Sequence, residues 1–397
     1  MKIGVVADNE LNDDKRVLKE INILREAGHQ IVVLCFGFDG KEYRSPGDFS
    51  VTRIRISKSL KNTLFFLLNT IPAYEWLWTW KIKSFITSNK PDILHVHDLY
   101  MSRAAAGGIR KAGVTIPIVL DLHENYPFAV TSYNWTRGFL RNLIARPYAW
   151  QRKEKEYLSY ASQIIVLSED FRDTLSGKYP SLPKERFVVF PNVPDLLQET
   201  NISGKSPDIS PDSSRPVLLY FGVVAERRGI FDVLKVFEEL ARENHPARFL
   251  VIGPVDKADR QRFFDAINSE ILDNMVFYIP WIDLSELMVY LDIADICIAP
   301  FHRNPQHESG VANKIYDYML GKRPLIVSDC KPQKNLVLKH RCGIAYSDNQ
   351  EMKEAIIKLS ADPELRREMG ENGYTAVISE LNTNIFRDKL LGIYSNR

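Results

Sequence analysis

The sequence is poor in the features that would place a chain in a specialised class at once. Its 397 residues include only four cysteines, Cys35, Cys297, Cys330 and Cys342. These are too few for a disulfide framework and too widely spaced for a zinc ribbon, so we expect a reducing compartment. The formal net charge is only +2, and no excess of basic residues predicts a nucleic acid partner.

Long hydrophobic runs are lacking as well. The most apolar window, residues 60–86, is interrupted by charged and polar side chains and by a proline, which argues against a membrane-spanning helix there. The first residues read as a strand that meets Asp8 and Glu10 at once, so we expect no signal peptide. These absences favour a cytoplasmic protein, and the 45% hydrophobic content suffices for large cores.

Strand-like and helical segments alternate along the chain, which predicts an α/β protein with doubly wound parallel sheets. In the first half we expect one long helix that ends near residue 161. Residues 201–216 are rich in Ser, Pro and Asp and lack periodicity, which is typical of a linker. We therefore predict two Rossmann-like domains and a C-terminal helix. Their bounds are 1–195 and 217–380 for the domains, 196–216 for the linker and 381–397 for the helix.

The segment at 307–329 combines a polar loop, a helix and a buried strand. The helix is predicted over 313–320, and we expect Gly321 to close it in the left-handed conformation. A loop that feeds a helix N-terminus presents unpaired amide groups and the positive end of the helix dipole, which suit an anion such as a diphosphate. Lys314 in the first turn adds positive charge.

Several ordered motifs resemble the retaining glycosyltransferases of the GT-B fold, family 4 (glycosyl transferases group 1). In the second half these are Tyr220-Phe-Gly-Val-Val-Ala-Glu-Arg-Arg-Gly229, Leu287-Met-Val-Tyr-Leu-Asp-Ile-Ala-Asp-Ile-Cys-Ile-Ala-Pro300 and Asn313-Lys-Ile-Tyr-Asp-Tyr-Met-Leu-Gly-Lys-Arg-Pro324. In the first half they are Pro91-Asp-Ile-Leu-His-Val-His97, Asp121-Leu-His-Glu124 and Phe190-Pro-Asn-Val-Pro-Asp195. The resemblance covers nearly the whole chain, and the ordered set is more specific than any one motif.

The resemblance implies two Rossmann-like domains facing a central cleft, with the C-terminal helix packed back on the first domain. It implies transfer of a sugar from a nucleotide-sugar to a hydroxyl acceptor with retention, the leaving phosphate helping to deprotonate the acceptor. No metal and no cofactor are expected. His95 and His97 share a face of one strand, but no further ligand stands at metal-site spacing and the Asp-x-Asp signature is missing.

The donor residues that the resemblance implies include two departures from the family. Arg228 matches a phosphate-binding lysine, but Val223 stands at the family's other basic position, for which Arg227 could substitute. Asp317 matches the ribose-binding carboxylate, whereas Ser309 stands where the family has a sugar-facing glutamate. The contact with the sugar that this glutamate makes in the family is then made either by the preceding Glu308 or by nearby backbone amides with the Ser309 hydroxyl. The expected donor set is Arg227, Arg228, Trp281, Glu308, Ser309, Gly310, Val311, Asn313, Lys314 and Asp317.

The catalytic set that follows is His123, Arg228 and Glu308, with His123 expected to meet the donor sugar. Trp281 could border the nucleotide base, although a core aromatic is the more usual role at such a position. The acceptor side is expected to use Asp14, Arg16, His97 and Glu124. For Asp14 the alternative is a helix N-cap, shared with its neighbour Asp13.

Two segments, 58–83 and 133–157, mix aromatic, apolar and basic residues. Such mixtures suit a membrane interface, and the acceptor would then be lipid-linked, as in assembly of surface polysaccharide or glycolipid, with the protein peripheral on the inner face of the membrane. Core-packing helices with solvated edges are the equal alternative. Two other functions also stay open: a nucleotide-sugar 2-epimerase or hydrolase of the same fold, and a non-catalytic GT-B subunit.

Overall fold

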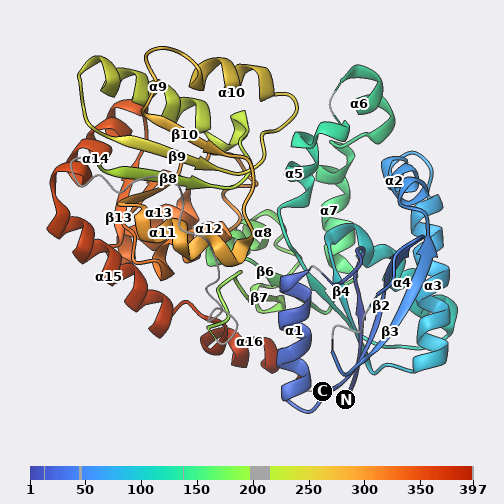
Figure 1. Cartoon of the computed structure of the whole chain (residues 1–397). Coiled ribbons are helices and arrows are strands. Elements are labelled where there is room, and N and C mark those ends of the chain that lie inside the picture. Colours follow the sequence, from blue (N-terminus) through green and yellow to red (C-terminus); the bar gives the residue numbers. More distant parts are fainter. Residues whose placement is uncertain (13, 44–46, 137, 197–214, 396–397) are drawn as a thin grey trace. The chain divides into compact units, whose positions relative to one another are not determined.

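A computed structural model of the chain describes residues 1–12, 14–43, 47–136, 138–196 and 215–395. They form two compact units: Met1–Pro191 with Phe386–Arg397, and Asn192–Ile385. Figure 1 shows each unit as a sheet covered by helices. Of the predicted linker, residues 197–214 lie outside the described part of the chain. Among the described helices, none is long and apolar enough to cross a membrane.

The N-terminal unit holds a parallel sheet of seven described strands in the order β3-β2-β1-β4-β5-β6-β7. The strands are β1 (Lys2–Val6), β2 (Gln30–Phe38), β3 (Ser50–Ile56), β4 (Ile93–His97), β5 (Ile118–Asp121), β6 (Gln163–Val166) and β7 (Phe187–Val189). The helices are α1 (Lys15–Glu26), α2 (Lys58–Phe66), α3 (Ala73–Asn89), α4 (Ser102–Ala112), α5 (Tyr126–Ser132), α6 (Phe139–Ala145), α7 (Ala149–Ser159), α8 (Glu169–Lys178) and most of α16 (Thr383–Ser395).

Two cores cover the two faces of this sheet, and the alternation of side chains along each strand assigns residues to them. On β2, Val32, Leu34 and Phe36 join the core that contains residues of α3, α4 and α7. Ile31 and Val33 point to the opposite core, which contains residues of α1 and α16. The predicted parallel sheet is therefore confirmed for this unit.

The prediction of one long helix that ends near residue 161 is wrong, because this segment forms three separate helices, α5, α6 and α7. Gly138 before α6 has φ 97°, a conformation that costs glycine little. Arg146 after α6 is left-handed, and Pro147 follows it. These breaks leave α6 as a short separate helix.

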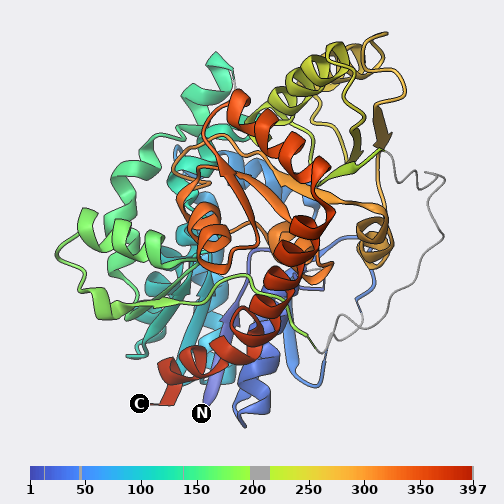
Figure 2. The same cartoon turned by 90° about the vertical axis from the view of Figure 1, so that its left-hand side faces the viewer.

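The C-terminal unit holds a parallel sheet of six described strands in the order β10-β9-β8-β11-β12-β13. The strands are β8 (Val217–Phe221), β9 (Arg248–Ile252), β10 (Val276–Ile279), β11 (Ile296–Ala299), β12 (Leu325–Ser328) and β13 (Gly343–Tyr346). The helices are α9 (Ile230–Arg242), α10 (Arg260–Ile267), α11 (Leu287–Ile293), α12 (Asn313–Leu320), α13 (Lys331–His340), α14 (Asn349–Ala361) and α15 (Pro363–Ser379). Helix α15 packs against α12, α13 and α14 (Figure 2).

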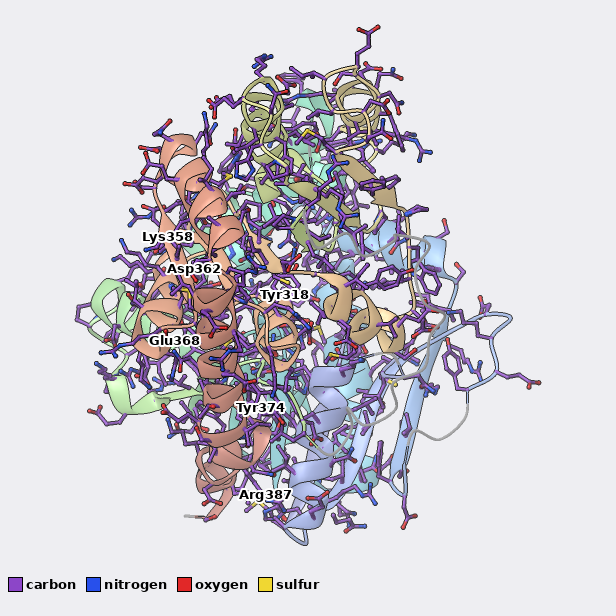
Figure 3. The ribbon with its side chains drawn as sticks, turned by 60° about the vertical axis from the view of Figure 1, so that its left-hand side comes forward. Tyr318, Lys358, Asp362, Glu368, Tyr374 and Arg387 are labelled. Carbon is purple, nitrogen blue, oxygen red and sulfur yellow. The ribbon has the colours of Figure 1, made fainter. Side chains whose placement is uncertain are left out.

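Helix α12 spans the residues predicted for it, but its closure differs from the expectation. Gly321 has φ −72°, so it is not left-handed; the left-handed residue is the next one, Lys322, with φ 55°. A Cβ on Gly321 would lie 2.8 Å from Leu291, so the glycine provides close packing. Tyr318 of α12 (labelled in Figure 3) accepts a 2.8 Å hydrogen bond from the amide of Phe221, which ties the helix to the end of β8.

Candidate active site

In each unit, polar residues follow the two central strands at which the strand order reverses. Such reversals create the crevice in which doubly wound sheets bind ligands. In the N-terminal unit the reversal lies between β1 and β4, which are neighbours in the sheet but not in the sequence. Asp8 lies just beyond β1, and His97 ends β4. In the C-terminal unit the reversal lies between β8 and β11.

A buried ionic network links α1 to the carboxyl ends of β4 and β5. The Arg16 guanidinium donates two hydrogen bonds, of 2.7 and 2.6 Å, to the Asp121 carboxylate. It also lies 3.2 Å from Glu20. The Asp121 carboxylate lies 3.0 Å from His123 Nε2 and 3.2 Å from His97 Nδ1. Asp121 thus holds three cationic or polar side chains around one carboxylate.

The network shifts the pKa values of Asp121 and His123 in opposite directions. Burial by itself would raise the pKa of Asp121, but Arg16 and His123 outweigh that and hold it well below its usual range. Burial would lower the pKa of His123, whereas the carboxylates of Asp98 and Asp121 raise it to about 10. His123 is therefore an imidazolium at neutral pH and offers N–H donors only.

The same network continues toward α16 through the histidines of β4. The rings of His95 and His97 are stacked with their centroids 4.6 Å apart, which confirms that they share a face. His95 Nδ1 lies 2.8 Å from the hydroxyl of Tyr394 on α16. The C-terminal helix is thus bound to the strand that carries His97.

Four residues of the network, Glu20, His95, His97 and Asp121, place possible metal-ligand atoms within 4.8 Å of one another. Arg16 already contacts both of the carboxylates in this group. The positive charge that a cation would bring is therefore supplied by a guanidinium. We assign the cluster as an ionic network that positions His97 and His123.

A second acidic cluster at this edge was missed from the sequence. Asp8 is buried, receives a hydrogen bond from the Tyr74 hydroxyl, and lies 3.6 Å from Lys61 of α2. Burial first, and then Asp98, raise the pKa of Asp8 to about 6, although Lys61 and Tyr74 act against them. The sequence held a signal for this cluster, because Asp8 and Asp98 come within two residues of the ends of neighbouring parallel strands.

The predicted acceptor residues occupy different environments. Asp14 is the N-cap of α1, where its side chain accepts a 3.0 Å hydrogen bond from the Val17 amide; Asp13 lies outside the described residues. Arg16 and His97 are buried in the network. Glu124 is partly exposed and receives a hydrogen bond from the Tyr133 hydroxyl.

The C-terminal unit brings two cations together where β8 and β11 end. The guanidinium of Arg228 and the ammonium of Lys314 each lie 5.1 Å from the centroid of the Phe301 ring. The Lys314 ammonium also lies 3.8 Å from the Tyr220 ring centroid. Aromatic faces attract cations, so the Phe301 ring is a common contact for two basic side chains that come from different sequence motifs.

Two glycines make this arrangement possible. A Cβ on Gly229 would lie 1.6 Å from the Pro300 carbonyl oxygen, so only glycine lets the turn that carries Arg228 approach β11 so closely. Gly222 has φ 131°, and its Cβ would lie 2.9 Å from the Lys314 ammonium. Lys314 therefore fills the space beside Gly222, next to Val223, the position at which the family places a basic side chain.

The electrostatics of this pair favour an anion. Burial first, and then the charge of Arg228, hold the pKa of Lys314 well below its usual range, with Asp317 acting weakly in the opposite direction. Burial, with Arg228 and Arg227 among the further causes, also lowers the pKa of His307 to about 4. An anion bound here would stabilise the charged forms of both groups.

Two further residues of the expected donor set are Arg227 and Trp281. Arg227 forms a 2.9 Å ion pair with Asp256, a residue of the same unit. Trp281 is 70% exposed, which corrects the core position that seemed more usual for it. An exposed indole leaves a stacking surface for a base.

The loop before α12 is held largely by its own polar groups. The Ser309 hydroxyl donates a 2.6 Å hydrogen bond to the Gln306 carbonyl, and Ser309 is buried. Glu308 accepts a 2.9 Å bond from Arg303 and is partly exposed. Asn313 begins α12, and Gly310 and Val311, which are partly exposed, lie three and two residues before it.

Asp317 lies one turn along α12 from Lys314 and is partly exposed. The structure thus gathers Arg228, Lys314 and the 308–317 segment at the carboxyl edge of one sheet. Phe301, the ring shared by both cations, was not foreseen; its only signal is that it follows β11 by two residues.

Two family models match the chain in sequence. Residues 16–196 match the model described as Glycosyltransferase Family 4, and residues 204–376 match Glycosyl transferases group 1. Among curated relatives, an alpha-D-kanosaminyltransferase from Streptomyces kanamyceticus is 23% identical over 286 residues, which are 70% of each chain.

Solved structures agree on the fold. Sucrose-phosphate synthase from Thermosynechococcus elongatus superposes with a TM-score of 0.74 at 16% identity, over 99% of this chain and 98% of that one. The Anabaena protein HepE, in complex with UDP, gives a TM-score of 0.68 at 14% identity over the whole of both chains. The chain therefore belongs to the GT-B glycosyltransferases of family 4, group 1.

Proposed function

We propose that this glycosyltransferase is retaining and metal-independent and moves a sugar from a nucleotide-sugar to a hydroxyl acceptor. The observation that carries the proposal is the pair formed by Arg228 and Lys314, two partly buried basic side chains that share the Phe301 ring. A nucleoside diphosphate supplies the negative charge that such a pair favours.

The proposed reaction breaks the bond between the anomeric carbon and the diphosphate and forms a bond to the acceptor oxygen on the same face. Negative charge develops on the leaving phosphate, where Arg228 and Lys314 stabilise it without a metal ion. The acceptor proton passes to a phosphate oxygen, so no protein base is required. The imidazolium of His123 donates a hydrogen bond to the sugar, and Asp317 accepts hydrogen bonds from the ribose hydroxyls.

Isothermal titration against UDP-, GDP- and TDP-sugars tests the proposal. UDP-sugars come first, because a structural relative was solved with UDP. We expect saturable binding of at least one donor, followed by transfer to an acceptor with retained anomeric configuration, read by nuclear magnetic resonance. Donor turnover without any acceptor would instead support an epimerase or hydrolase. Absence of binding by every donor would support a non-catalytic subunit and overturn the proposal.

Chelation is expected to leave the reaction unchanged. Because Arg228 and Lys314 supply the charge at the leaving group, excess EDTA should not alter the initial rate of donor consumption. The control is a metal-dependent glycosyltransferase assayed in the same buffer, which EDTA must inhibit. A rate that falls with EDTA and returns with added Mg²⁺ or Mn²⁺ would contradict metal independence.

Replacement of Asp317 by alanine is expected to weaken donor binding by about 10-fold to 100-fold, since a carboxylate to ribose hydroxyl bond contributes roughly 1.5–3 kcal/mol. Glu308→Ala is the comparison, because Glu308 is bound to Arg303 within its own loop. Titration of each variant with the preferred donor and with free nucleoside diphosphate distinguishes a lost contact with the sugar from a lost contact with the nucleotide. If Glu308→Ala weakens only the donor, Glu308 contacts the sugar; if it changes neither, Ser309 and the backbone amides do.

A further inference from the structure

A groove opens on helices α3 and α4, which pack side by side in the N-terminal unit (Figure 1). Its volume of about 520 Å³ lies within the range of small-ligand sites. The lining comes from α3, α4 and the C-terminal end of α7. The described lining residues include none of the donor, acceptor or catalytic residues discussed above. The groove is therefore a separate feature of this unit.

Two exposed tryptophans form the aromatic part of the lining. Trp76 and Trp80 are four residues apart on α3, so they lie on the same face of the helix. They are 59% and 54% exposed. The opposite face of α3 is apolar as well and places Tyr74, Trp78 and Ile82 in the core. A surface helix normally combines one apolar face with a polar one, so core packing does not account for the two exposed tryptophans.

The floor and the aromatic side of the groove are held in place by local contacts. A Cβ on Gly107 of α4 would lie 3.1 Å from the Thr79 hydroxyl of α3, so the glycine lets the two helices approach closely. The ammonium groups of Lys83 and Lys111 lie 5.3 and 4.7 Å from the centroid of the Trp80 ring. These contacts restrict the indole, so less conformational freedom is lost when a ligand packs against it.

The polar part of the lining carries charges of both signs. Arg103 Nε lies 3.2 Å from the Glu75 carboxylate and 3.8 Å from the Glu156 carboxylate. The Tyr160 hydroxyl donates a 2.8 Å hydrogen bond to Glu156. A guanidinium has five N–H donors and each carboxylate accepts several hydrogen bonds, so these groups keep capacity for a ligand. The whole lining holds three basic and two acidic residues, so a strongly charged ligand of either sign would meet like charges.

We propose that this groove binds an uncharged oligosaccharide. The C–H face of a pyranose ring is apolar and packs on an aromatic ring. Its hydroxyl groups both donate and accept, so they pair with a guanidinium and with carboxylates alike. A polyanion would be repelled by Glu75 and Glu156, and a purely apolar ligand would leave these charges desolvated without partners.

The groove begins next to the acceptor edge of the same unit. The Tyr74 hydroxyl donates a hydrogen bond to Asp8, just beyond β1, and the adjacent Glu75 lines the groove. Helix α4 begins shortly after His97 ends β4, and Arg103 in its first turn lines the groove as well. The groove therefore binds the sugars of an acceptor chain that lie away from the reacting hydroxyl. This extension rests on the proposed function, whereas the binding of the oligosaccharide does not.

Isothermal titration of the full chain with maltopentaose, cellopentaose and mannopentaose tests the proposal, with a heparin pentasaccharide as the anionic comparison. We expect saturable binding of at least one neutral oligosaccharide, little changed by added salt. Trp76→Ala combined with Trp80→Ala should weaken this binding by at least about tenfold, because two aromatic contacts are lost. Glu156→Gln should weaken it by about fivefold. Phe139→Ala, which removes an exposed aromatic ring of α6 in the same unit, is the matched control and should bind as the wild type does.

Three results would overturn the proposal: no binding of any neutral oligosaccharide, equal binding by the double tryptophan variant, or binding of the heparin pentasaccharide alone. The double variant should keep the wild-type melting temperature, because both side chains are more than half exposed. In a transfer assay it should raise the KM for an oligosaccharide acceptor and leave that for a monosaccharide acceptor unchanged. An unchanged KM for both would overturn the extension to the acceptor chain.

Titration with nucleotide-sugars separates this test from that of the proposed function. A wild type that binds the oligosaccharide but no nucleotide-sugar would overturn only the proposed function. A double variant that binds the nucleotide-sugar normally and has lost the oligosaccharide would support the groove as a site of its own.

Discussion

Replacing Lys314 by methionine is expected to lower turnover about 10²- to 10³-fold without lowering the melting temperature. The loss in rate has the size found when one group that stabilises developing negative charge is removed. The unchanged or raised melting temperature follows because burial and Arg228 both disfavour the Lys314 ammonium in the protein without ligand. A group that costs folding energy but serves the reaction is the signature of a binding site.

Three measurements check this prediction. Steady-state rates give the effect on turnover, titration with nucleoside diphosphate gives the effect on binding, and calorimetry gives the melting temperature. Lys339→Met is the matched control, since Lys339 is an exposed lysine of the same unit that is bound to Glu380. It should leave all three near the wild-type values. A Lys314→Met protein that melts lower and turns over normally would show that Lys314 serves only packing on Tyr220.

Replacing Asp121 by asparagine is expected to lower the free energy of unfolding by about 3–5 kcal/mol, because removal of one partner leaves Arg16 buried without its main counter-charge. Asparagine keeps the shape but not the charge. Glu26→Gln is the control: its partner Arg387 and Glu26 itself are partly or largely exposed, so a change within about 0.5 kcal/mol is expected. Denaturant unfolding of both variants checks the difference.

The same variant has an expected pH signature at His123. The raised pKa of His123, about 10, means that its protonation stabilises the folded state fully below the ordinary histidine pKa near 6.5. That contribution is lost as the pH rises from there through 10. In Asp121→Asn the pKa of His123 should fall, so the decline in stability should move to lower pH. A pH titration of the His123 ring, monitored by nuclear magnetic resonance, checks this shift. An unchanged His123 pKa would show that Asp98, and not Asp121, is the main cause of the raised value.

Much of the local structure follows from local chemistry. The alternation of apolar strands and amphipathic helices predicts the parallel α/β sheets, which the structure confirms. Helix α12 begins at Asn313 and ends at Leu320 as predicted, since a polar loop precedes it and Gly321 and Pro324 follow. The ordered motifs identify the family for a similar reason: each is a short continuous stretch of the chain, in which sequence spacing and spatial position agree.

Three expectations from local patterns differ from the structure. The stretch after β5 has enough apolar residues for one long helix, yet Gly138 and Pro147 divide it and leave α6 with its apolar side outward. Gly321 was expected to be left-handed, but it is glycine because Leu291 lies against it. Trp281 is exposed although its strand context is typical of a core aromatic.

The sequence by itself determined the family, the two α/β sheets and the residues that stand at strand ends, because these depend on periodicity and short motifs. Only the tertiary structure decided which charges meet. Lys314 and Arg228 are far apart in the sequence and share one ring because β8 and β11 are neighbours. Arg16 and Asp121 meet because α1 packs on the sheet that contains β5. Coulomb interactions depend on distance in space, which spacing along the chain does not fix.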